Sequence, residues 1–242
     1  MGVAVRRGTQ SFAPGDTTVQ DDICAQYAPN ANVIRAEFAI NDPDGNCNIK
    51  KKSEGIAPCR GACSPRFPDV PAGNPYYAPV MHLNTSEVVS GYADGSFRPY
   101  SSVTRAQVAK IVVLAFGFPL VSSDKQRFSD VAANDPTASY IETAYAHGLV
   151  SGYADGSFRP TNSVTRGQLA KMVVVAAGIS PVTPAGPTFR DVKAGSPFYG
   201  YVEAGYAQGL LSGYADGTFR PGAEANRGQV CKIVVLAAPP EE

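Results

Sequence analysis

The sequence predicts a mainly α-helical protein made of three helix–loop–helix repeats, preceded by a small β-rich segment. One block of sequence occurs three times at a spacing of 61 residues, and apolar residues within each copy recur at helical intervals. Residues 33–40 instead alternate apolar and polar, as strands do. Because one pair of helices buries too little surface to be stable alone, we expect the three repeats to share a core in a pseudo-threefold bundle.

The repeat is clearest in a ten-residue loop. Residues 90–99 read Ser-Gly-Tyr-Ala-Asp-Gly-Ser-Phe-Arg-Pro and recur at 151–160 and, with Thr for the second Ser, at 212–221. A Phe-x-Asp-Val block precedes each loop and a Thr/Asn-Arg-Ala/Gly-Gln block follows it, always in the same phase. These blocks divide the chain into a segment 1–66 and repeats 67–127, 128–188 and 189–242.

A first helix is expected before each loop. Ile141, Tyr145 and Leu149 are spaced by four residues and predict one helical face. Gly148 stands near the end of this stripe, where a glycine commonly terminates a helix. The Asp-Gly pair of the following loop favours a tight turn, and its phenylalanine is expected to anchor the loop in the core.

A second helix is expected after each loop. Thr104 with Gln107 forms a capping box, and Thr165 with Gln168 repeats it. The apolar stripes that follow are Val108, Ile111, Val112 and Ala115; Leu169, Met172, Val173 and Ala176; and Val230, Ile233, Val234 and Ala237.

The N-terminal segment has a different pattern. After the strand expected at 33–40, residues 42–46 form a turn cluster and 47–52 can return as a second strand. A two-stranded hairpin is marginally stable alone. The segment is therefore the end of a larger β domain, a small disulfide-stapled unit, or strands completed by another chain.

Four of the five cysteines lie in this segment. Their spacing lacks the paired Cys-x-x-Cys of zinc ribbons, so we favour two disulfides in an oxidising compartment over a thiolate zinc site. The pairing stays open among three possibilities for Cys24, Cys47, Cys59 and Cys63. Cys231 falls on a predicted helix, as a small buried residue.

Composition excludes several classes of protein. The 21 basic and 21 acidic side chains balance, which argues against a nucleic-acid binder. His82 and His147 are the only histidines and occupy non-equivalent repeat positions, so we expect no enzyme, no cofactor and no metal site. No apolar run is long enough to span a membrane, and the N-terminus lacks a signal-peptide core. We expect that a signal has been removed or that the chain is a fragment.

The repeated blocks resemble the S-layer homology family over residues 67–238, roughly seventy per cent of the chain. The matching pieces are Phe-x-Asp-Val, Gly-Tyr-x-Asp-Gly-Ser/Thr-Phe-Arg-Pro, and Thr-Arg-Ala/Gly-Gln where the family usually has Glu. The resemblance implies a three-pronged bundle that attaches exported bacterial proteins to the cell envelope. The implied partner is a secondary cell-wall polysaccharide with a pyruvate ketal on its terminal sugar, held in grooves between repeats.

The local chemistry suits such an anion. An arginine in the first helical turn combines a bidentate guanidinium with free N–H groups and the positive end of the helix dipole. The alternative is that Arg105 pairs with Asp130 or Asp69, and that the loop aspartates cap their own turns. The candidate glycan-binding residues are Arg105, Arg166, Arg227, Tyr92, Tyr153, Tyr214, Asp94, Asp155 and Asp216.

Repeat 1 departs most from the pattern. Pro79 and Asn84 replace tyrosines of the other repeats, and Glu87 replaces their glycine, so we expect the groove beside its first helix to be inactive. A second hypothesis is a structural protein that self-assembles with copies of itself into a layer or filament. A third is an accessory subunit of a larger extracellular complex.

Overall fold

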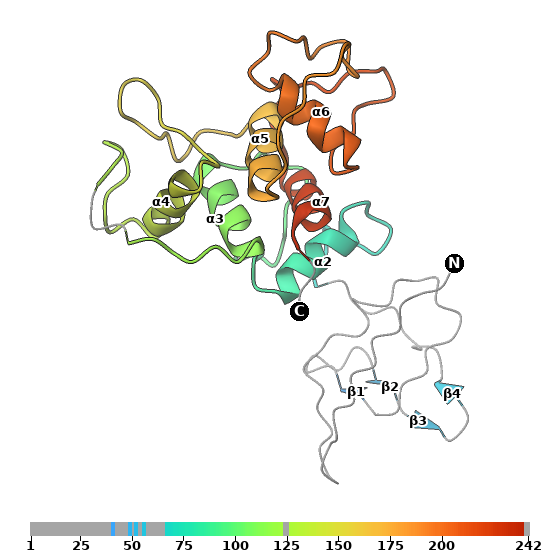
Figure 1. The fold of residues 1–242 in the computed structure, drawn as a ribbon. Coiled ribbons are helices and arrows are strands. Elements are labelled where there is room, and N and C mark those ends of the chain that lie inside the picture. The colour runs from blue at the N-terminus through green and yellow to red at the C-terminus, as the bar shows by residue number, and fades with distance from the viewer. Residues whose placement is uncertain are drawn as a thin grey trace. The chain divides into compact units, whose positions relative to one another are not determined.

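The computed structural model describes residues 66–122 and 126–239, together with four short strands nearer the N-terminus. Contacts divide the chain into two units, Met1–Pro65 and Arg66–Glu242. Six helices lie within the described part of the second unit (Figure 1). They are α2 (Tyr77–Thr85), α3 (Arg105–Ala115), α4 (Ala138–Ala146), α5 (Arg166–Ala176), α6 (Tyr199–Ala207) and α7 (Arg227–Ala237).

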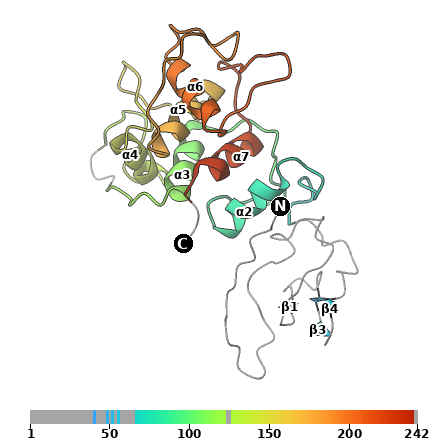
Figure 2. The ribbon, with the colours of Figure 1, turned by 45° about the vertical axis from the view of Figure 1, so that its right-hand side comes forward.

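The helices pair between repeats. The second helix of repeat 1, α3, packs against α4 of repeat 2, and α5 packs in the same way against α6. The last helix, α7, returns to pack against α2 and so closes a ring of three pairs. Helices α3, α5 and α7 also contact one another and form the centre, with α2, α4 and α6 outside them (Figures 1 and 2). The predicted mainly helical architecture of three repeats is confirmed.

A ring of backbone hydrogen bonds lies where the three loops meet. The N–H of Val103 donates to the carbonyl of Ala225, Ala225 to Val164, and Val164 back to Val103, at 3.3, 2.8 and 3.0 Å. All three residues are fully buried. Because each repeat gives one bond to a neighbour and receives one from the other, no repeat can leave without breaking two of them.

The helix starts follow the predicted capping boxes. Thr104, Thr165 and Asn226 each accept the N–H of a glutamine three residues later, and that glutamine side chain accepts the cap residue's own N–H. These contacts are local, which is why sequence spacing alone predicts them. The loop phenylalanines are buried as expected; they are Phe97, Phe158 and Phe219.

The first helices end in a Schellman motif. The N–H of Leu149 reaches the carbonyl of Ala144, and Gly148, at φ +69°, donates to Tyr145. Repeat 1 makes the same turn with Glu87 at φ +57°, a backbone region that side chains with a Cβ rarely adopt. The predicted stripe also needs a correction, because Tyr145 is 38% exposed and packs edge-on against Phe128 at the surface.

Two antiparallel strand pairs are described in the first unit. Strand β1 (Ile40–Asn41) pairs with β2 (Asn48–Ile49), and β3 (Lys51–Lys52) pairs with β4 (Gly55–Ile56). The rest of the strand expected at 33–40 and the turn at 42–46 lie outside the described residues. So do Cys24, Cys47, Cys59 and Cys63, whose disulfides remain a prediction.

Within the described ranges, no helix has the length and apolar character needed to cross a bilayer. The same residues hold no group of three His, Cys, Asp or Glu side chains placed to bind a metal ion.

Candidate functional site

Each candidate arginine reaches from the start of a central helix into the next loop. In α5, Arg166 donates from Nε to the carbonyl of Phe219 at 2.8 Å and from Nη2 to that of Ser212 at 3.0 Å. Its guanidinium also lies 4.5 Å from the Phe219 ring centroid. The same side chain therefore joins repeat 2 to repeat 3. The equivalent bonds join Arg105 to Phe158 and Ser151, and Arg227 to Phe97 and Ser90.

The backbone at these helix starts is already occupied. The first two N–H groups of α5, on Arg166 and Gly167, donate to the carbonyls of Ala223 and Pro221 in the next repeat. The third donates to the Thr165 side chain. Helices α3 and α7 begin in the same way. The expectation that free N–H groups would receive an anion here is therefore wrong, and an anion must be met by side chains.

The three arginines are buried cations that make no ion pair with a carboxylate in the described residues. Their exposed fractions are 6–8%, and burial lowers the pKa of Arg105 and Arg166 from the ordinary value. Asp130, considered as a partner for Arg105, instead accepts the backbone N–H groups of Phe158 and Arg159. Among the described residues, Nη1 of each arginine has no hydrogen-bond partner.

The loop tyrosines lie against guanidinium groups. Arg220 lies over the Tyr214 ring at 3.9 Å from its centroid, and Arg166 is 5.1 Å from the same centroid. Tyr92 and Tyr153 likewise have one arginine neighbour from their own repeat and one from another repeat. Part of each ring expected to meet a sugar is thus covered by the protein's own arginine.

The loop aspartates hold their own turns. Asp216 accepts bonds from the backbone and hydroxyl of Thr218, at 3.0 and 2.6 Å, and from the Arg220 guanidinium at 3.0 Å. These contacts lower the pKa of the Asp216 carboxyl to about 2. Asp94 and Asp155 are bonded in the same way. These aspartates therefore cap their own turns, which was the alternative role considered for them. Direct contact with a sugar stays a prediction.

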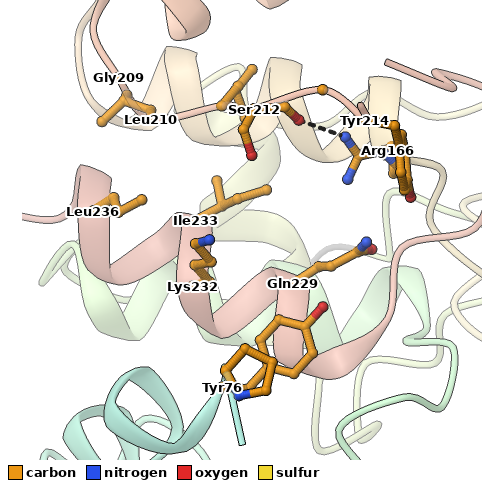
Figure 3. Close-up of a pocket in the computed structure, with 13 residues that line it drawn as sticks. Tyr76, Arg166, Gly209, Leu210, Ser212, Tyr214, Gln229, Lys232, Ile233 and Leu236 are labelled. Carbon is orange, nitrogen blue, oxygen red and sulfur yellow. Dashed lines mark hydrogen bonds between the residues drawn. The ribbon is translucent and has the colours of Figure 1, made fainter. Parts of the chain in front are cut away.

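A groove of about 280 Å³ opens beside Arg166. It is lined by all three repeats, with Arg166 from repeat 2, Tyr214 and helix α7 from repeat 3, and Tyr76 from repeat 1. Figure 3 shows Arg166 and Tyr214 together at one side and Tyr76 at another, with Gln229 and Lys232 of α7 between them. The sequence interpretation missed Tyr76 and Lys232 as site residues, since only the ring closure brings α2 to α7.

The comparisons with known proteins agree with this architecture. The model of the S-layer homology domain matches residues 66–109, 127–170 and 188–231, more than half of the chain. The chain therefore belongs to the S-layer homology domain family. It is a protein of the bacterial cell surface, as its relatives' names also indicate.

Three curated relatives illustrate the similarity. Cell surface glycoprotein 1 of Acetivibrio thermocellus is 32% identical over 54% of this chain and 6% of its own length. The cellulosome-anchoring protein of the same organism is 30% identical over 60% of this chain and 34% of its own length. S-layer protein EA1 of Bacillus anthracis is 26% identical over 75% of this chain and 21% of its own length. The matched part of this chain thus spans about a third or less of each relative's length.

Proposed function

We propose that the chain anchors its protein non-covalently to the cell envelope by binding an anionic cell-wall polysaccharide in the grooves between its repeats. The observation that carries this is the buried Arg166, whose charge has no carboxylate partner among the described residues and whose Nη1 is not bonded there. A buried charge is stable when an opposite charge meets it. A ligand carboxylate in the groove would supply that charge with a charge-assisted hydrogen bond.

A pyruvate ketal on a terminal sugar has the matching chemistry. It places one carboxylate on a compact ring, and the groove volume of about 280 Å³ is near the lower end of the range of about 300–1,000 Å³ typical of small-molecule sites. That size favours one terminal sugar over an internal stretch of polymer. The cellulosome-anchoring protein among the relatives supports an anchoring role by its name.

Sedimentation with purified sacculi tests the proposal. The labelled full chain should pellet with intact sacculi and remain in solution after hydrofluoric acid has removed the secondary polysaccharide. Mild acid hydrolysis, which cleaves ketals, should reduce pelleting while the polysaccharide stays on the wall. Lys193→Gln, which removes an exposed charge that does not line the groove, serves as the control for non-specific attraction. Equal pelleting with stripped sacculi would contradict the proposal.

A structural role in a surface layer is the second candidate, favoured by relatives whose names are surface-layer proteins. It predicts association without any glycan. Sedimentation velocity of the purified chain separates the two, because an anchor module stays monomeric at high concentration and a lattice protein does not.

A further inference from the structure

We infer that the three inter-repeat grooves are not equivalent, and that the groove beside Arg166 is the principal site for an anionic sugar because Lys232 and Tyr76 complete it. This inference rests on the proposed function. It follows from comparing the residues that ring closure brings to equivalent positions in the three grooves.

The first difference is a second cation. Lys232 on α7 lines the Arg166 groove. The lysines at the equivalent repeat positions each lie over a tyrosine: the ammonium of Lys110 is 5.5 Å from the ring centroid of Tyr140, and that of Lys171 is 5.9 Å from the ring centroid of Tyr201.

Lys232 lacks such a tyrosine because of one substitution in repeat 1. Helix α7 packs against α2, and α2 carries Pro79 where α4 and α6 carry Tyr140 and Tyr201. Proline has no aromatic face to attract an ammonium group. Among the described residues Lys232 therefore has no ring over which to sit and no ion-pair partner. Pro79, from which the groove beside the first helix of repeat 1 was expected to be inactive, thus leaves a cation available in the groove that Tyr76 of repeat 1 helps to line.

The second difference is an aromatic wall. Tyr76 lines the Arg166 groove and is held by an edge contact with Tyr100, at 5.7 Å between centroids. By repeat position, the residue equivalent to Tyr76 in the groove of Arg105 is Phe198, which lacks the hydroxyl, and in the groove of Arg227 it is Thr137, which lacks the ring. A tyrosine offers both an apolar face for a sugar ring and a hydroxyl for its polar edge.

The third difference disfavours the groove beside Arg227. At the helix end that borders it, Glu87 stands where the other two grooves have Gly148 and Gly209. Its exposed carboxylate lies next to the segment whose carbonyl at Ser90 is bonded by Arg227. A like charge at the rim opposes an anionic ligand. Among the described residues, a lysine with no ring partner, a tyrosine at the position of Tyr76 and a glycine at the position of Gly209 occur together only around Arg166.

Calorimetric titration of the full chain with the methyl glycoside of a 4,6-pyruvylated hexose tests this ranking. The matched pair is Lys232→Met and Lys171→Met, which remove the same charge at equivalent helix positions. Because a hydrogen bond to a charged group is among the strong ones, Lys232→Met should weaken binding about tenfold or more and Lys171→Met less than about twofold. Tyr76→Thr and Phe198→Thr form a second pair with the same expected order. Thermal midpoints measured on all four variants report whether each one folds.

One result would contradict the ranking alone, and another would contradict the proposed function. Weakening by Lys171→Met as large as that by Lys232→Met would overturn the ranking while leaving glycan binding intact. Wild-type binding of the pyruvylated sugar no tighter than of the same sugar without pyruvate would overturn the proposed function itself, and the ranking with it.

Discussion

Arg227 donates a hydrogen bond from Nε to the carbonyl of Phe97, 130 residues earlier in the chain, at 2.9 Å. This bond closes the ring, since it ties the last helix of repeat 3 to the loop of repeat 1. The same contact made by Arg105 and Arg166 joins residues 53 apart. The arginines that are candidates for ligand binding therefore also hold the repeats together, and tests of the two roles need different variants.

Replacing Arg227 with Met should destabilise the bundle by about 2–4 kcal/mol, because the buried carbonyl of Phe97 and the part-buried carbonyl of Ser90 lose their donor. Urea unfolding of the full chain measures this. Arg220→Gln is the matched control, since that guanidinium is half exposed and its ion pair contributes about 0–1 kcal/mol. Equal losses in the two variants would show that ring closure contributes nothing special.

Gly152→Ala should cost about 1–3 kcal/mol by overpacking. An added Cβ would fall 2.5 Å from Phe128 Cε1 and 3.1 Å from the carbonyl oxygen of Ser157. Gly195→Ala is the control, because nothing lies within 4 Å of its position and its φ is not positive. Thermal unfolding compares the two. A Gly152→Ala variant as stable as the control would mean that the loop moves away from Phe128 at little cost.

Glu87→Gly should stabilise the chain by about 1 kcal/mol, since Glu87 occupies the left-handed region that penalises a Cβ. Adding a Cβ at the equivalent position of repeat 2, with Gly148→Ala, should destabilise the chain by a similar amount. Chemical unfolding of both variants measures whether the free energy of unfolding rises for Glu87→Gly and falls for Gly148→Ala. A loss of stability on Glu87→Gly would indicate that the Glu87 side chain makes a favourable contact that outweighs the backbone strain.

Stability should fall between about pH 4 and pH 2. The contacts of Asp155 and Asp216 lower the pKa of each folded carboxyl to about 2, below the unfolded value of about 3.9. Such groups stabilise the fold fully above the unfolded pKa, and the contribution is lost as the pH falls through the folded pKa. The double variant Asp155→Asn, Asp216→Asn should show a shallower fall in thermal midpoint across this window. An identical slope would refute the assignment to these two side chains.

Cys231 should resist alkylation in the folded chain. Burial raises the pKa of its thiol to about 12, so the reactive thiolate is scarce at neutral pH. Iodoacetamide labelling followed by peptide mass spectrometry should leave the Cys231 peptide unmodified without urea and modify it in urea. Rapid labelling of the native chain would mean that α7 opens readily.

Sequence patterns predicted the parts of the fold that depend on neighbours in the chain. The capping box of Thr104 with Gln107 spans three residues, and the turn that Asp216 makes with Thr218 spans two. Interactions this short need no partner from elsewhere in the chain, so the spacing of the residues is enough to predict them. The three repeats, the helix starts and the buried loop phenylalanines followed from such patterns, and so did the family resemblance.

The candidate site could be recognised only in the folded chain, because its residues come from different repeats. The sequence placed Arg166 at a helix start, but its carbonyl partners lie 46 and 53 residues away in the next repeat. The groove needs Tyr76 beside α7, which no local spacing encodes, because only ring closure brings α2 and α7 together. The repeat pattern therefore specified which residues recur, while packing between repeats selected which of those copies line a groove and which are used to hold the bundle. The physical reason is that local hydrogen bonds are set by spacing along the chain, whereas burial of a cation and freedom of a lysine depend on what another repeat places opposite them.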